Sequence, residues 1–158
     1  MLCCSKHWVQ TVTKFKKAKT ESLLSRIIRT FTNNLSHSGR YMVIAWGNTE
    51  VGIDVQQYDT AVDLEGIGEH YFTSDELAYI RENAHQRTER FCEIWTKKES
   101  CLKYTGEGLR RNIRSFSTLA PEYPIRYWYW KPDAHHSLCL YAVDQEITFE
   151  LLEIRQPL

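Results

Sequence analysis

The spacing of apolar residues between positions 91 and 103 predicts a long amphipathic helix. Four apolar residues fall on one face at helical spacing: Phe91, Ile94, Trp95 and Leu102. We expect the helix to span about 87–104 and to end at Gly106, a residue suited to a left-handed cap. The other predicted elements lie before or after this helix in the sequence.

The chain before this helix predicts strands and then short helices. A continuous apolar run at 41–46 is typical of a buried strand, and 51–55 is expected to form a hairpin with it. The polar, glycine-containing stretch 34–40 is expected to be a turn. A short helix is predicted at 63–71. Thr73 and Glu76 form a capping box that starts another helix, ending near 83.

The chain after the helix predicts mainly strands. They are expected near Phe116 and at 125–130, 138–143 and 147–152, with a turn at 131–133. The order of strands, helices and strands indicates an α+β fold, with a largely antiparallel sheet packed against the long helix.

Composition is that of one folded domain. The chain has 158 residues, of which 42% are hydrophobic, and no apolar run long enough to span a membrane. Twenty basic and twenty acidic residues balance, which disfavours a general affinity for nucleic acid or anionic membranes. We therefore expect no nucleic-acid and no membrane partner.

Residues 1–33 differ from the rest. Positions 1–29 carry seven Lys or Arg and one acid, and 23–28 has the spacing of a short amphipathic helix. This basic segment faintly resembles an organelle transit peptide, and a nucleic-acid-binding arm is a weaker alternative because no recognition motif accompanies it. We therefore divide the chain into a basic segment, 1–33, and a domain, 34–158.

Cysteine usage favours a reducing compartment. The chain has five cysteines, an odd number, and no Cys-x-x-Cys pair. No secretory signal is visible, because the first residues lack an apolar core. The sequence therefore predicts reduced thiols in a cytoplasmic protein.

Charged residues on the long helix have two interpretations. Glu99 follows Lys98 directly and precedes Lys103 by one turn, an arrangement that suits a site for a metal ion and phosphate. The alternative is a solvated helix pair between Glu99 and Lys103, worth about 0.2–0.5 kcal/mol. The helix alone favours this second interpretation.

Three stretches considered together favour the first interpretation, a site for a metal ion and phosphate. Ser36-His37-Ser38-Gly39-Arg40, then Gly52-Ile53-Asp54-Val55-Gln56, then Trp95 through Lys103 occur in this order. In order and separation they resemble the 4′-phosphopantetheinyl transferase superfamily, specifically its surfactin-synthetase type. The resemblance runs from about 34 to 109. It implies a lobe of that family's fold and Mg²⁺-dependent transfer of phosphopantetheine from coenzyme A to a serine of an acyl or peptidyl carrier protein.

The resemblance also implies a role for each site residue. Asp54 and Glu99 would bind Mg²⁺, with Gln56 as a weak ligand, directly or through water, where relatives often have an acid. Glu99 would also act, directly or through a water, as a base for the carrier serine, and Lys103 would hold phosphate. Glu76 matches a glutamate that relatives place near the site, although its capping box explains it equally well. Contacts to coenzyme A are implied for His37, Ser38, Arg40, Lys98 and Lys103.

One departure from the family is large. Relatives of this type usually have two similar lobes with coenzyme A between them, and 1–33 is too short to form the first lobe. A truncated gene product, a remnant, or a chain that restores the cleft as a homo-oligomer would each account for this. The alternative function is therefore a catalytically impaired family remnant that acts at most as a binding protein.

Overall fold

The computed structural model describes residues 32–59, 63–120, 126–143 and 148–153. The helix predicted at 23–28 and most of the basic segment lie outside these residues. The described ranges hold, in order, β1 (Thr32–Ser38), β2 (Tyr41–Gly47), β3 (Val51–Gln57), α2 (Leu64–Tyr71), α3 (Ser74–Arg81), η1 (Ala84–Gln86), α4 (Arg87–Thr105), η2 (Gly108–Arg110), η3 (Ile113–Ser115), β4 (Arg126–Asp133), β5 (His136–Ala142) and β6 (Thr148–Glu153).

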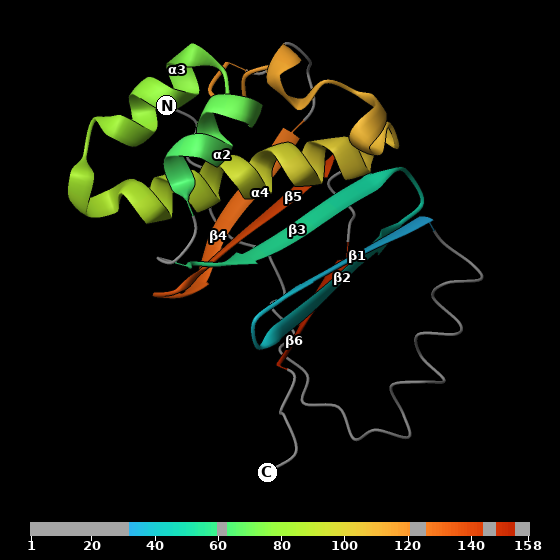
Figure 1. Ribbon diagram of the computed structural model, residues 1–158. Helices are drawn as coiled ribbons and strands as arrows, with labels where there is room; N and C mark the ends of the chain where they lie inside the picture. The colour runs from blue at the N-terminus through green and yellow to red at the C-terminus, as the bar shows by residue number, and fades with distance from the viewer. Residues whose placement is uncertain (1–31, 60–62, 121–125, 144–147, 154–158) are drawn as a thin grey trace, which may run out of the picture.

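The strands form two antiparallel sheets, and α4 lies across one of them. The sheet orders are β1-β2-β6 and β3-β5-β4. In Figure 1, α4 runs along β3 and β5, with α2 and α3 on its far side. The predicted α+β class, with antiparallel strands packed against a long helix, is confirmed. None of the helices in the described ranges is long and apolar enough to cross a membrane.

The main core lies between the two sheets. The inward residues of β2 and β3 alternate along each strand, and those of β5 meet them to form one apolar cluster. Its buried members are Tyr41, Val43, Ala45, Val51, Ile53, Val55, Leu138, Leu140 and Ala142. The other face of β3, which carries Asp54, is left to pack on α4.

Gly52 allows α4 to lie directly on β3. A Cβ atom at this position would overlap the carbonyl oxygen of Ser100 and the amide nitrogen of Tyr104, both backbone atoms of α4. The absence of a side chain therefore brings the helix close enough for residues 99–103 to reach the next residues of β3. Close packing against α4 therefore explains why the first residue of the Gly-Ile-Asp stretch is glycine.

Three local predictions about the helices are confirmed. The helix predicted at 87–104 is α4, and Gly106 caps it with a left-handed φ of 68°. The capping box at Thr73 and Glu76 is present at the start of α3. These signals depend on residues a few positions apart, so local sequence suffices to specify them.

Four local predictions about the strands are wrong. Residues 41–46 and 51–55 do not form a hairpin, because β2 pairs with β1 and β6 while β3 pairs with β5. The predicted turn at 34–40 is mostly strand β1. Phe116 follows η3 and is not in a strand. Residues 131–133 belong to β4, so its turn into β5 comes later, after a bulge between Trp130 and Asp133.

Side chains of β1 explain why a polar stretch is a strand. Asn34, Ser36 and Ser38 alternate along β1 and accept hydrogen bonds from the backbone amides of β3, with donor–acceptor distances of 3.2, 3.3 and 2.9 Å. The donors are the amides of Ile53, Val55 and Gln57. Polar side chains thus satisfy the edge of β3 that no strand among the described residues pairs with.

Candidate active site

Asp54 lies at the centre of the candidate site. Its side chain is 8% exposed. One oxygen, Oδ1, accepts a hydrogen bond from the Ser36 hydroxyl at 2.7 Å and an ion-pair contact from Lys103 Nζ at 2.8 Å. Ser36 also accepts from the Val55 amide, so its own orientation is fixed. The carboxylate is therefore held from both β1 and α4.

Glu99 faces the same place from α4. Burial raises the pKa of its carboxyl, the negative charge of Asp54 raises it further, and Lys103 opposes both effects. Burial likewise raises the pKa of Asp54 against the lowering contributions of Lys103 and Ser36. Two carboxylates therefore repel each other around one ammonium group, which is the electrostatic setting in which an added cation is stabilised.

Lys98 occupies a different environment from Lys103. Its side chain is fully buried, and its ammonium group donates to the carbonyl oxygens of Ile113 and Phe116 at 2.8 and 2.6 Å. It also pairs with Glu76 Oε2 at 2.9 Å. These three partners use all three ammonium hydrogens. The structure therefore gives no support to the prediction that Lys98 contacts coenzyme A.

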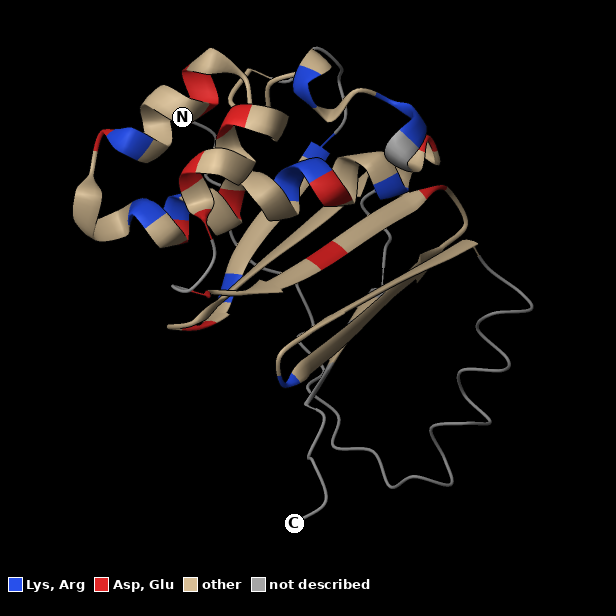
Figure 2. Cartoon of the chain, in the orientation of Figure 1, with Lys and Arg blue, Asp and Glu red and all other residues tan. Residues whose placement is uncertain are grey.

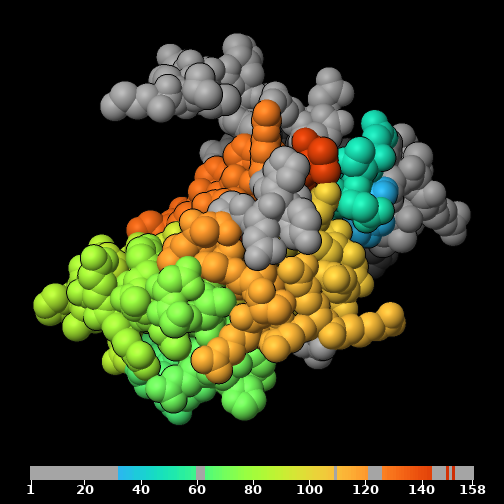
Figure 3. Space-filling view, turned by 90° about the horizontal axis from the view of Figure 1, so that it is seen from above, coloured from blue at the N-terminus to red at the C-terminus, as the bar shows by residue number. Residues whose placement is uncertain are grey.

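Glu76 completes this internal pair. Its carboxylate accepts from the amide and hydroxyl of Thr73 and from the amide and hydroxyl of Thr118. The segment around η3 is thereby tied to α3, and Figure 3 shows the two lying against each other. Glu76 is fully buried, and Asp54 is not among these partners. The capping box accounts for the contacts with Thr73, whereas those with Lys98 and Thr118 are tertiary contacts that the capping box does not explain.

The residues of the Ser-His-Ser stretch separate onto two faces of β1. Ser38 lies on the same face as Ser36 and binds the Gln57 amide. His37, between them, is exposed and points to the opposite face. Arg40 lies in the turn after β1, half exposed, and pairs with Asp133 at 2.7 Å. The structure therefore brings neither His37 nor Arg40 into contact with Asp54.

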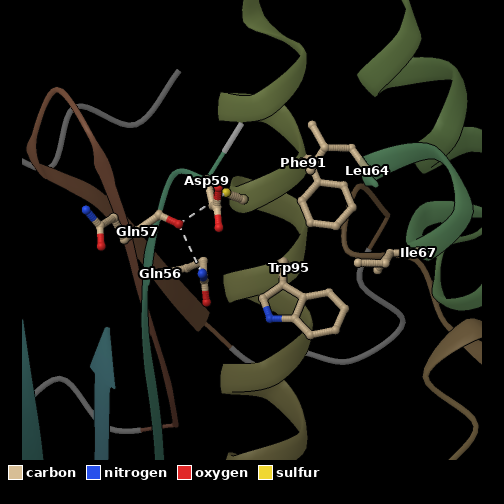
Figure 4. Close-up of a pocket in the computed structure, with 8 residues that line it drawn as sticks. Gln56, Gln57, Asp59, Leu64, Ile67, Phe91 and Trp95 are labelled. Atoms are coloured by element: carbon tan, nitrogen blue, oxygen red, sulfur yellow. Dashed lines mark hydrogen bonds between the residues drawn. The ribbon is translucent and has the colours of Figure 1, made fainter. Parts of the chain in front are cut away.

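Gln56 lines an apolar cavity next to the candidate site. It follows Asp54 by two residues on β3, and its side-chain amide donates to the Gln57 carbonyl at 3.0 Å. The cavity, of about 180 Å³, lies between β3, α2 and α4, and Figure 4 shows Phe91, Trp95, Leu64 and Ile67 around it. It is lined by Gln56, Gln57, Asp59, Leu64, Ile67, Phe91, Cys92 and Trp95.

The donor set fits Mg²⁺ bound together with a phosphate ligand. No group of three His, Cys, Asp or Glu side chains that would hold a metal occurs within the described ranges. Mg²⁺, however, is commonly held by one or two carboxylates, with substrate phosphate oxygens and waters completing its shell. Two carboxylates, those of Asp54 and Glu99, are available here, and Asp54 already pairs with a cationic group, the ammonium of Lys103. Gln56 adds an amide oxygen nearby in sequence.

Ser36 is the site residue that the sequence did not single out. Its hydroxyl contacts Asp54 directly, whereas the resemblance assigned roles in this stretch to His37, Ser38 and Arg40. The available signal was the alternation of Asn34, Ser36 and Ser38, which places three polar side chains on one face of a strand. A strand prediction for 32–38 would have revealed it. Figure 2 shows that charged residues gather mainly on the helices, with few on the strands.

The chain is similar in sequence to known 4′-phosphopantetheinyl transferases. The 4′-phosphopantetheinyl transferase psf-1 of Bacillus pumilus is 36% identical over 98 residues, 61% of this chain and 41% of that protein. The 4′-phosphopantetheinyl transferase Sfp of Bacillus subtilis (strain 168) is 33% identical over 85 residues, 53% of this chain and 37% of that protein. The chain thus spans about two-fifths of the length of these curated relatives.

A solved structure and a family model complete the comparison. The crystal structure of Thermotoga maritima holo-[acyl-carrier-protein] synthase has a TM-score of 0.49 and 18% identity, covering 68% of this chain and 65% of that one. The model of the 4′-phosphopantetheinyl transferase superfamily matches residues 50–145, which include Asp54, Glu99 and Lys103. Because this match spans more than half of the chain, the chain belongs to the 4′-phosphopantetheinyl transferase superfamily.

Proposed function

We propose that this chain transfers 4′-phosphopantetheine from coenzyme A to a serine of an acyl or peptidyl carrier protein, with Mg²⁺. The observation that supports this most is the meeting of Asp54, Glu99 and Lys103 where α4 lies on β3, inside the residues that match the family. Such a reaction needs charge neutralisation and alignment at a pyrophosphate more than it needs a covalent intermediate.

Each residue is proposed to have a separate task. Asp54 and Glu99 would hold Mg²⁺, which when bound neutralises charge on the pyrophosphate of coenzyme A. Ser36 positions the Asp54 carboxylate. Lys103 would hold a phosphate oxygen, and its ammonium group is exposed enough to do so. Gln56, weakly or through water, would complete the metal shell.

Glu99 is proposed as the base that takes the proton of the carrier serine. It faces the surroundings of Asp54 and Lys103 from α4, and it would take the proton directly or through a water. The serine oxygen would then attack the phosphorus that bears pantetheine, and 3′,5′-ADP would leave. Contacts of coenzyme A with His37, Ser38 and Arg40 stay predictions, as does a homo-oligomer that completes the cleft.

The apolar cavity beside Gln56 is proposed to receive part of the acceptor protein. It opens on the same side of β3 as Asp54, and aromatic side chains of α4 line it. An apolar side chain docked there would bring the acceptor serine toward Glu99.

We propose the cytoplasm as the location, because Cys92, Cys101 and Cys139 are unpaired among the described residues.

The experiment is incubation of the chain with coenzyme A, Mg²⁺ and an apo-carrier protein, followed by intact mass spectrometry of the carrier. Transfer adds the phosphopantetheine mass. Asp54→Asn should reduce the rate by about 100-fold or more, as expected when a group that acts on transition-state charge is lost. Glu69→Gln, an exposed change on α2, is the matched control and should leave the rate unchanged.

Two results would count against this function. A folded chain at high concentration that gives no mass gain with several carriers would refute transferase activity. Coenzyme A binding without transfer, measured by calorimetry, would favour the alternative of a binding protein. Light scattering tests the homo-oligomer in the same samples.

A further inference from the structure

Lys103 makes a contact with Asp54 that a bound metal would contest. Its ammonium nitrogen lies 2.8 Å from Asp54 Oδ1 and 3.2 Å from the Ile53 carbonyl oxygen. The same Oδ1 accepts from Ser36 at 2.7 Å. A carboxylate on a side chain that is only 8% exposed is costly unless a positive charge compensates it, and Lys103 supplies that charge.

The ammonium group is not locked in this place. Its side chain is 28% exposed, and the two contacts use two of its three hydrogens. Four flexible methylene groups join it to α4. Lys98, five residues earlier, differs in each respect, because it is fully buried and has three partners. Lys103 can therefore leave its partner without exposing a cavity in the core.

A divalent cation and this ammonium group cannot both lie against Asp54. They carry like charges, and at contact distance in a half-buried site their repulsion is large. With Asp54 and Glu99 ionised and Lys103 present, the three groups sum to one negative charge. A ligand that brings at least one further negative charge is therefore needed before the two positive charges of a divalent cation are fully neutralised there.

We propose that Lys103 is an internal counterion, which neutralises Asp54 in the ligand-free protein and moves to a phosphate oxygen when a divalent cation takes its place. This rests on the proposed metal site at Asp54. It makes metal binding and phosphate binding mutually dependent: the cation displaces Lys103, and the phosphate gives the displaced ammonium group a new partner. Metal alone then binds weakly, and metal with a pyrophosphate group binds well.

The test measures Mn²⁺ binding to the full chain by calorimetry and electron paramagnetic resonance, without and with inorganic pyrophosphate. Lys103→Met and Lys103→Gln should bind Mn²⁺ alone about tenfold more tightly than the unchanged chain. Pyrophosphate should strengthen Mn²⁺ binding in the unchanged chain and do so less in both variants. Lys131→Met, which removes an exposed lysine paired with Glu89, is the control and should match the unchanged chain.

The outcomes separate the two proposals. If Asp54→Asn loses Mn²⁺ binding but both Lys103 variants bind Mn²⁺ no more tightly than the unchanged chain, the exchange is refuted and the metal site stands. If Asp54→Asn binds Mn²⁺ as the unchanged chain does, the metal site itself is refuted, and the exchange with it. Lys103→Gln keeps a hydrogen-bond donor for Asp54, so it provides a folded variant if Lys103→Met unfolds.

Discussion

Two lysines of α4, Lys98 and Lys103, each pair with a carboxylate, and the two pairs differ in how deeply they are buried. Lys98 and Glu76 are both fully buried, and every hydrogen of the ammonium group has a partner. Lys103 and Asp54 are 28% and 8% exposed at their side chains, and a second carboxylate, Glu99, faces them. The first pair has no capacity left for a ligand. The second has an unmet negative charge and a movable cation.

The surroundings of the two pairs differ for a clear reason. Glu76 and Lys98 join α3, α4 and the segment after η3, all of which pack around them. Asp54 and Lys103 join β3 to α4 at the edge where β1 supplies only side chains to β3. A backbone-paired strand at that edge would have closed the site. Here β1 instead contributes the Ser36 hydroxyl, which contacts Asp54 directly.

The largest effect is expected from breaking the buried pair. Lys98→Met leaves Glu76 buried without its cation and should lower the free energy of unfolding by about 3–5 kcal/mol. Urea unfolding followed by tryptophan fluorescence measures it. Lys131→Met should cost no more than about 1 kcal/mol, because its pair is exposed. A loss at position 98 as small as this control would show that the buried Lys98–Glu76 pair is worth no more than an exposed pair.

An intermediate effect is expected from Gly52→Ala. The added Cβ meets backbone atoms of Ser100 and Tyr104, so α4 must move away from β3 at a cost of about 1–3 kcal/mol. The shift should weaken the Asp54–Lys103 pair and spare Lys98. Urea unfolding measures the cost. Gly66→Ala is the control, because its Cβ meets only the end of the Asp63 side chain; equal costs would refute the close approach of α4.

The smallest effect is expected from Asp133, whose partner Arg40 has a half-exposed side chain. Burial would raise the pKa of Asp133, but hydrogen bonds from His136, the His135 amide and Arg40 lower it on balance. A lowered pKa stabilises the fold above the unfolded value of about 3.9, and this contribution is lost as the pH falls through the folded value.

Asp133→Asn should therefore cost about 1 kcal/mol at neutral pH, a figure reduced for solvent screening. The difference from the unchanged chain should shrink as the pH falls below about 4. Urea unfolding at several pH values measures both. A difference that grows in acid would contradict the assigned direction of the pKa shift.

Local signals in the sequence were sufficient for the helices and for the resemblance to the family. The period of α4, the capping box at Thr73 and the cap at Gly106 each depend on neighbours within one or two turns. The order of the Gly-Ile-Asp and Lys-Glu stretches was enough to suggest the family, and the family match confirms it. The roles of the individual residues stay predictions.

Only the tertiary structure decided which lysine is buried and which strands pair. Lys98 and Lys103 are five residues apart, so they leave α4 about 140° from each other and meet different partners. Those partners, Glu76 and Asp54, come from distant segments. The β2–β3 hairpin failed for the same reason, because β3 finds β5 more than eighty residues later. Burial and strand pairing are set by contacts far apart in the chain, which local patterns do not encode.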